Sequence, residues 1–299
     1  MEFMVNCYNK SDHKLSWEGK MMKTIRKTAI VMLLCVYFLT YGVLPQVEAG
    51  KDTPVIVVAH RAGAKVAPEN TLAALKQAIR VGAPIAEIDV QQLSDGTLIV
   101  MHDSNFKRTA GEDVCVWDAE ADVLSALEVG SAFSAAYRGE QIPTLEEMLA
   151  CAGGRIALMI ELKYTGQEQK LEENVLALLQ EYDMMDECII GSMNKGILQR
   201  VRELEPDIST VYIAHDLGED DYDLDYADSY SIEGKNLTTD MVEAIHYEGK
   251  YVYGWTANTS GAMRQIVNSG ADGIVTDDVR LLQTFLRENT CRKAFESVY

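Results

Sequence analysis

The sequence predicts an α/β fold, a TIM-type (β/α)8 barrel, from its length, its composition and its periodicity. The chain has 299 residues and 47% of them are hydrophobic, which is enough for a single large core. Short apolar runs rich in β-branched residues alternate with helical patterns along most of the chain. This alternation is typical of parallel strands with crossover helices, and about eight such units close into a barrel.

The apolar runs and helical patterns give the expected elements. Nine strands are expected at residues 55–59, 85–91, 98–102, 156–162, 188–191, 210–214, 228–232, 251–255 and 273–276. The expected helices include residues 70–81, 144–151, 168–182, 194–204, 238–248 and 260–269. Residues 103–143 follow the third strand and are long enough to form a small insertion over one mouth of the barrel.

The ninth strand is explained by a hairpin within "EIDVQQLSDGTLIVMH". Asp95-Gly96 is a strong signal for a two-residue turn. With that turn, Leu93 would face Leu98 and Asp89 would face His102. Directly opposed residues lie about 5 Å apart at Cβ, so the hairpin would bring His102 to the acids of the preceding strand.

Residues 1–50 are expected to form a leader, and residues 51–299 the barrel domain. Thr28–Val47 contains no charged residue and follows Lys23, Arg26 and Lys27. This layout indicates either a signal peptide, cut after Ala49, or a single membrane anchor, and it fits a buried core helix less well. Both interpretations place the domain outside the cytoplasm, secreted or anchored to a bacterial cell membrane.

Charge and cysteine content exclude several classes of protein. The net charge is −19, and the chain after residue 50 holds 21 Lys and Arg against 42 Asp and Glu. Such an acidic body repels nucleic acid, so a nucleic-acid partner is not expected. The six cysteines lack the short spacings of zinc sites. We expect mostly core cysteines, with a Cys115–Cys151 disulfide as the open alternative.

Three acidic residues stand on expected strands. Glu87 and Asp89 are two residues apart, so their side chains project from the same face of a strand. Glu161 lies near the end of another apolar strand. Three carboxylates without a cysteine ligand favour a hard divalent cation, Ca²⁺ or Mg²⁺, over zinc. An ion pair with Arg or Lys is the alternative role for any one of these acids.

Two histidines and two cations accompany these acids. His60 and His102 each end an apolar strand, and catalytic groups gather at the carboxyl ends of barrel strands. Arg61 and Lys163 supply positive charge that suits a phosphate, although Lys163 can also pair with Glu161. A phosphodiester substrate would use all of these groups, with two imidazoles as acid and base. His215 and His246 receive no role.

Five motifs resemble a known family. In order and spacing, "HRAGAKVAPENT", "EIDVQQLSDGTLIVMHD", "ELK", "GWTAN" and "GIVTDD" are similar to those of the glycerophosphodiester phosphodiesterases, whose fold is a phospholipase-C-like TIM barrel. The resemblance runs from Val55 to Leu286. The stretch "MHDSNFKRTAG" resembles the bacterial branch whose catalytic domain is tethered to the membrane.

The resemblance implies metal-dependent hydrolysis of glycerophosphodiesters to glycerol 3-phosphate and an alcohol. It implies these roles: His60 and His102 as the acid and base; Glu87, Asp89 and Glu161 as ligands of one Ca²⁺ or Mg²⁺; Arg61, Lys163 and Trp255 as substrate-binding residues. Packing in the barrel is the alternative role of Trp255. The family usually has Gly directly after the His-Arg pair, where this chain has Ala62, whose methyl group would narrow the approach to the phosphate or shift the loop.

Other functions remain open at this point. The same architecture would suit a lysophospholipase D-like enzyme or a teichoic-acid glycerol-phosphate hydrolase. Trp117, Phe133 and Tyr137 in residues 103–143 would favour a lipid-derived substrate. A non-catalytic glycerophosphodiester-binding protein is a further alternative, and a metal-dependent sugar isomerase fits the paired imidazoles less well.

Overall fold

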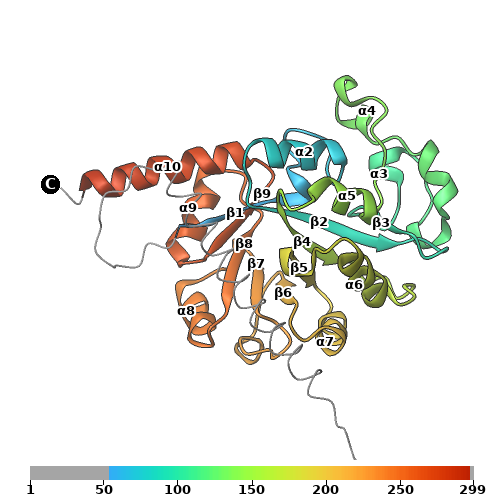
Figure 1. Cartoon of the computed structure of the whole chain (residues 1–299). Helices are drawn as coiled ribbons and strands as arrows, with labels where there is room; N and C mark the ends of the chain where they lie inside the picture. Colours follow the sequence, from blue (N-terminus) through green and yellow to red (C-terminus); the bar gives the residue numbers. More distant parts are fainter. Residues whose placement is uncertain (1–53, 297–299) are drawn as a thin grey trace, which may run out of the picture. The chain divides into compact units, whose positions relative to one another are not determined.

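The computed structural model describes residues 54–296, with side chains as far as residue 290. Eight parallel strands form a closed barrel in the order β1-β9-β8-β7-β6-β5-β4-β2, and β1 also pairs with β2 (Figure 1). The predicted (β/α)8 fold is therefore confirmed. The strands are β1 Ile56–Ala59, β2 Ile85–Gln92, β3 Leu98–Val100, β4 Ala157–Leu162, β5 Cys188–Ser192, β6 Ser209–Ala214, β7 Ser229–Glu233, β8 Tyr251–Trp255 and β9 Gly273–Thr276.

Helices connect most successive strands, and several begin with a side chain that accepts a hydrogen bond from the first turn. Every strand and helix expected from the sequence overlaps an observed element. The connection from β6 to β7, which the structure describes throughout, holds only the short helix η6 Glu219–Asp221. The longer helices are α2 Leu72–Arg80, α5 Leu145–Ala152, α6 Leu171–Glu181, α7 Lys195–Leu204, α8 Thr239–Tyr247, α9 Ser260–Ser269 and α10 Val279–Glu296.

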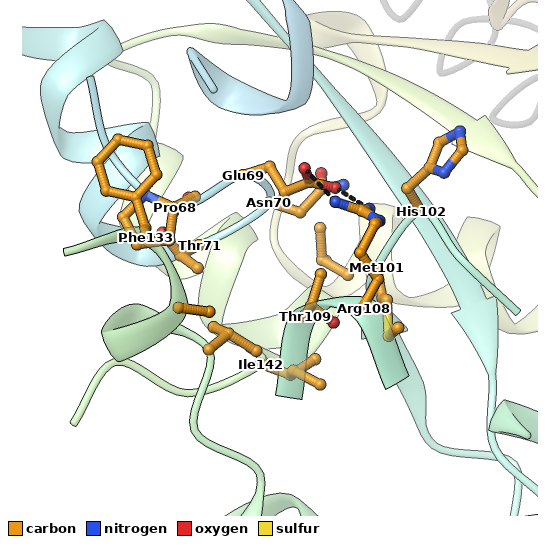
Figure 2. Close-up of a pocket in the computed structure, with 13 residues that line it drawn as sticks. Pro68, Glu69, Asn70, Thr71, Met101, His102, Arg108, Thr109, Phe133 and Ile142 are labelled. Atoms are coloured by element: carbon orange, nitrogen blue, oxygen red, sulfur yellow. Dashed lines mark hydrogen bonds and ion pairs between the residues drawn. The ribbon is translucent and has the colours of Figure 1, made fainter. Parts of the chain in front are cut away.

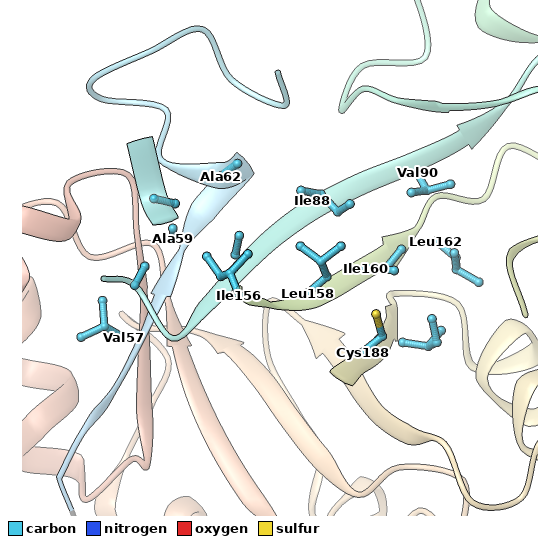
Figure 3. Close-up of a cluster of buried hydrophobic side chains, with 14 of the residues drawn as sticks. Val57, Ala59, Ala62, Ile88, Val90, Ile156, Leu158, Ile160, Leu162 and Cys188 are labelled. Atoms are coloured by element: carbon cyan, nitrogen blue, oxygen red, sulfur yellow. The ribbon is translucent and has the colours of Figure 1, made fainter. Parts of the chain in front are cut away.

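Alternation along the strands decides which side chains reach the barrel interior. On β2, Ile88 and Val90 join the apolar layer between strands and helices, as Ile160 does on β4 (Figure 3). The intervening residues therefore face inward, because successive side chains of a strand point to opposite faces. Apolar side chains such as Ile85 and Met159 fill the interior. The acids further along the same strands lie on this inner face.

The hairpin forms, but its predicted register is wrong by one residue. Gln92 pairs with Leu98 and Val90 with Val100, so neither predicted pair forms. The loop has three residues, because the Gly96 amide donates to the Leu93 carbonyl and Gly96 adopts a φ of +91°. A type I turn followed by a left-handed glycine is the usual three-residue hairpin.

The segment after β3 is a folded insertion, as expected. It holds α3 Lys107–Ala110, η2 Val116–Asp118, η3 Ala121–Ala126, α4 Gly130–Phe133 and η4 Ala135–Tyr137. Its apolar side chains form a separate cluster with Leu93 and Ile99 of the hairpin. The Tyr137 hydroxyl donates to the Val66 carbonyl, which ties the insertion to the loop between β1 and α2.

The described residues also bear on the cysteines and on membrane spans. Cys115, Cys151 and Cys188 are free, so no Cys115–Cys151 disulfide is present. Within residues 54–296, no helix is long and apolar enough to cross a bilayer. The predicted leader, residues 1–50, lies outside the described residues.

Candidate active site

Three buried carboxylates meet inside the barrel mouth. Glu87 and Asp89 come from β2 and Glu161 from β4, and Asp89 is paired with Glu161 in the parallel ladder. One carboxylate oxygen from each of the three lies within 4.8 Å of the others. The spacing that predicted a shared face for Glu87 and Asp89 is therefore confirmed. We call Glu87, Asp89 and Glu161 the acidic triad.

The triad is only partly neutralised by the protein. The Lys163 ammonium lies 2.8 Å from Asp89 Oδ1 and 2.8 Å from Glu161 Oε1. Burial alone would raise the pKa of Asp89, but the charge of Lys163 holds it well below the usual range. For Glu87, burial and then the charge of Asp89 raise the pKa to about 8. Glu87 is thus the carboxylate of the triad that does not pair with Lys163, and the charge of His60 lowers its pKa only in part.

This donor set fits a divalent cation. Three carboxylates from rigid strands provide the oxygen ligands that Ca²⁺ and Mg²⁺ prefer. The raised pKa of Glu87 reflects its burial and then the negative charge of Asp89, and a bound cation would favour the ionised carboxylate. The triad accordingly matches the metal ligands expected from the sequence.

His60 reaches this mouth at the end of β1, in the short helix η1 His60–Ala62. Its Nδ1 lies 2.6 Å from Asp277 Oδ1, and Asp277 also accepts a hydrogen bond from Asn258. Burial alone would lower the pKa of His60, but this hydrogen bond and the charges of Glu87 and Asp277 raise it. Since an ionised carboxylate only accepts, Nδ1 donates to Asp277 and Nε2 is left for a ligand.

His102 also lies at the mouth, although the predicted cross-strand pairing with Asp89 does not form. The Met101 amide donates to the Asp89 carbonyl, so Met101 takes the position opposite Asp89. The Gln91 side chain donates to the carbonyls of Met101 and Asp103, at 2.8 and 2.7 Å, and holds the bend that carries His102. His102 Nδ1 lies 2.8 Å from Asp103 Oδ1. Burial lowers the pKa of His102 more than the charge of Asp89 raises it.

The β1–α2 loop places Arg61 beside the triad. The Arg61 amide donates to Glu87 Oε2 at 2.7 Å, and the Arg61 Nε lies 3.8 Å from Asp89 Oδ2. That Nε is buried and donates no hydrogen bond within the described residues, so its charge is balanced there by the Asp89 carboxylate. Ala62 is fully buried and keeps a left-handed φ of 62°. The loop therefore makes the turn that glycine favours, at a cost of about 1 kcal/mol for the methyl group.

Trp255 lies at the end of β8, as expected. Its Nε1 donates to the Ser231 carbonyl at 3.0 Å, and its ring centroid is 5.2 Å from that of His215. Part of the ring packs with the apolar barrel interior. Both roles considered for Trp255, packing and lining the mouth, are therefore compatible with its position. His215, which received no role, pairs with Glu233.

Several residues that support the site were missed by the sequence reasoning. Asn70 donates to Asp89 Oδ2 at 2.7 Å and accepts from the Asp89 amide. Glu69 accepts from Arg61 Nη1 at 2.8 Å. Asp277 follows the apolar strand β9, and Asp103 follows His102. Their positions after strand ends were a usable signal, because the carboxyl ends of parallel strands meet at one mouth.

Comparison with known proteins identifies the family. Residues 60–281 match the model of the glycerophosphoryl diester phosphodiesterase family. The chain belongs to this family. A glycerophosphodiester phosphodiesterase of Caldanaerobacter subterraneus is 32% identical over 243 residues, which are 78% of this chain and 98% of the relative. One from Bacillus subtilis is 29% identical over 281 residues, covering 85% of this chain and 96% of the relative.

A solved structure of similar fold contains a reaction product. It is an Oleispira antarctica phosphodiesterase in complex with the product sn-glycerol-3-phosphate. The TM-score is 0.74 at 26% identity, over 78% of this chain and 96% of that chain. This protein therefore has the same fold as a phosphodiesterase of known structure.

Replacing Asp277 with Asn should lower the pKa of His60, because the Asp277 hydrogen bond and charge help to raise it. The limb of the kcat/KM pH profile that belongs to His60 should then move to lower pH. A raised histidine pKa stabilises the fold below the ordinary value of 6.5 and loses this effect as pH rises through the raised value. Asp277→Asn should therefore reduce the free energy of unfolding more at acidic than at alkaline pH.

Urea unfolding at the two pH values and a pH–rate profile check this expectation. Asp278→Asn is the matched control, because Asp278 accepts a backbone hydrogen bond from Leu281 that an asparagine side chain can also accept. An unchanged profile in Asp277→Asn would contradict the role given to the His60–Asp277 pair.

Proposed function

We propose that this protein hydrolyses glycerophosphodiesters to glycerol 3-phosphate and an alcohol. The observation that carries the proposal is the acidic triad with His60 and His102 at the same barrel mouth. Family membership, the names of the curated relatives and the product in the Oleispira antarctica structure support it. The expected phosphodiester substrate is a small molecule or one derived from a lipid.

Glu87, Asp89 and Glu161 would hold one divalent cation, Ca²⁺ or Mg²⁺. When bound, such a cation stabilises the negative charge that develops on phosphoryl oxygens. Arg61, whose guanidinium lies beside Asp89, would contact the phosphate. Lys163 stays with Asp89 and Glu161 and adds positive charge at the same place. Trp255 would line the part of the mouth that the glycerol occupies.

The two histidines would act as acid and base. Nδ1 of His60 is hydrogen-bonded to Asp277, and Nδ1 of His102 is hydrogen-bonded to Asp103. In each ring Nε2 would therefore face the substrate. Their pKa values move in opposite directions, upward for His60 and downward for His102. Environments that separate two pKa values in this way favour His60 as the proton donor and His102 as the acceptor.

Removal of divalent cations should abolish release of glycerol 3-phosphate from glycerophosphocholine, and Ca²⁺ or Mg²⁺ should restore it. Either cation should also raise the melting temperature of the parent protein, because a ligand that binds the native state stabilises it. Glu87→Gln should lose both effects. Without cation, Glu87→Gln should be at least as stable as the parent, since a raised carboxyl pKa destabilises the fold above the ordinary value. Full activity in excess chelator would show that hydrolysis does not require a divalent cation.

His60→Ala and His102→Ala should each lower kcat by about a hundredfold or more, because general acid–base catalysis contributes that much. Circular dichroism and thermal melting should show both variants folded. His246→Ala is the control, because His246 pairs with Asp272 on the outside of the barrel. Near-normal hydrolysis by either active-site variant would reject its role. Substrate binding by the parent without turnover would indicate a non-catalytic binding protein.

A lysophospholipase D-like activity is the second candidate, and one observation favours it. A cavity of about 160 Å³ lies between the insertion and the segment before α2 (Figure 2). Polar side chains that include Glu69, Arg108 and His102 line it together with apolar Pro68, Met101, Phe133 and Ile142. These apolar side chains suit an alcohol with an apolar portion. Of the three aromatic residues suggested by the sequence, Phe133 lines this cavity. Faster hydrolysis of a lysophospholipid than of glycerophosphocholine would favour this candidate over the first, and a teichoic-acid fragment tests the remaining alternative.

We also propose that residues 1–50 are a leader that places the 51–299 domain outside the cytoplasm. The uncharged segment Thr28–Val47 behind three basic residues supports this proposal. Mass spectrometry of the native protein should find either a mature chain beginning at Gly50 in the medium or an intact chain in the membrane fraction. An intact chain in the soluble cytoplasmic fraction would reject the proposal.

A further inference from the structure

Arg108 belongs to the insertion, yet its guanidinium lies between two carboxylates of the barrel mouth. It stands on α3, and its side chain is about half exposed. Figure 2 shows Arg108 directed at Glu69, with His102 nearby, just after the end of β3. Its partners are Glu69, from the loop before α2, and Asp103, which directly follows His102 at the start of the insertion. One side chain of the insertion thus contacts two segments that carry site residues.

The first pair of contacts leads to His102. Arg108 Nε donates to Asp103 Oδ2 at 2.6 Å, and Nη2 donates to Asp103 Oδ1 at 3.1 Å. The same Oδ1 lies 2.8 Å from His102 Nδ1. The hydrogen bond from Arg108 is the main reason that the pKa of Asp103 falls to about 2. Arg108 therefore holds the carboxylate that orients the His102 ring.

The second pair of contacts leads to Arg61. Arg108 Nη1 and Nη2 donate to the two Glu69 oxygens, at 2.9 and 2.6 Å. Glu69 Oε1 also accepts from Arg61 Nη1 at 2.8 Å. Burial alone would raise the pKa of Glu69, but the two arginines lower it and keep the carboxylate charged. Arg108 therefore holds the carboxylate that orients the Arg61 guanidinium.

We infer that Arg108 is a positioning residue that sets the geometry of His102 through Asp103 and of Arg61 through Glu69. The inference rests on the proposed roles of His102 and Arg61. Only an arginine has the planar fork of donors that can hold both carboxylates at once. Without that cation, Asp103 and Glu69 would repel each other and turn toward solvent. Through Arg108, the insertion beside the mouth thus helps to orient the groups proposed for catalysis and phosphate binding.

Arg108→Met should therefore affect two kinetic parameters by separate routes. Loss of the Asp103 contact should lower kcat between about tenfold and a hundredfold, the range expected when a catalytic group is displaced by about 1 Å. Loss of the Glu69 contact should raise KM, because Arg61 is proposed to bind the phosphate. Steady-state kinetics with glycerophosphocholine measure both effects.

Double variants separate these routes. In the Asp103→Asn background, Arg108→Met should no longer lower kcat but should still raise KM. In the Glu69→Gln background, Arg108→Met should no longer raise KM but should still lower kcat. Non-additivity of this kind is expected for residues that act through one another. Arg108→Lys should recover only part of the loss, because an ammonium group cannot make both paired contacts.

Controls keep the outcomes distinct. Lys107→Met removes a neighbouring cation of the same helix, whose pair with Asp113 is exposed, and should leave kcat and KM unchanged. Thermal melting must show that Arg108→Met is folded, and Arg108→Lys serves as the test if it is not. Losses that persist undiminished in both double variants, or near-normal kinetics in Arg108→Met, would overturn the inference. Near-normal hydrolysis by His102→Ala would instead show that the role proposed for His102 is wrong. Absence of hydrolysis by the parent protein would show that the proposed function is wrong.

Discussion

The close approach of three carboxylates inside an apolar barrel is the constraint around which the mouth of this structure is organised. Burial and mutual repulsion both disfavour ionisation of such a group. The buried ammonium group of Lys163 and hydrogen bonds from the Arg61 amide and the Asn70 side chain partly stabilise the ionised carboxylates. Burial and the remaining negative charge still raise the pKa values of Glu87 and Glu161. A site in this state is suited to a divalent cation.

The barrel supplies the rigidity that this arrangement needs. Alternate residues of β2 and β4 are fixed in the apolar layer beneath the helices, so the acids between them cannot turn away from the mouth. The histidines instead follow the ends of β1 and β3, where the backbone leaves the sheet. Each is held by a carboxylate at Nδ1, which leaves the opposite ring nitrogen for chemistry.

A chain of ion pairs and hydrogen bonds joins these groups. It runs from Arg61 through Glu69 to Arg108, and from there through Asp103 to His102. Its members come from the β1–α2 loop, from His102 just after β3, and from the insertion, residues 103–143. Because Arg108 is half exposed, the chain lies at the edge of the mouth, where a substrate would enter. The insertion therefore contributes both to the shape of the mouth and to the orientation of its charged groups.

The sequence by itself determined the eight-stranded barrel, the additional hairpin strand within the described residues, and the grouping of the triad with both histidines. These features follow from local periodicity, which places Glu87 and Asp89 on one face, and from the rule that strand ends share one mouth. Tertiary structure alone decided the pairing of His60 with Asp277, 217 residues apart, and of Arg108 with Glu69, 39 residues apart. Such pairs depend on side-chain positions that no local pattern encodes. The hairpin register likewise depended on the left-handed backbone of Gly96, which selected a three-residue loop where the Asp-Gly signal had predicted two.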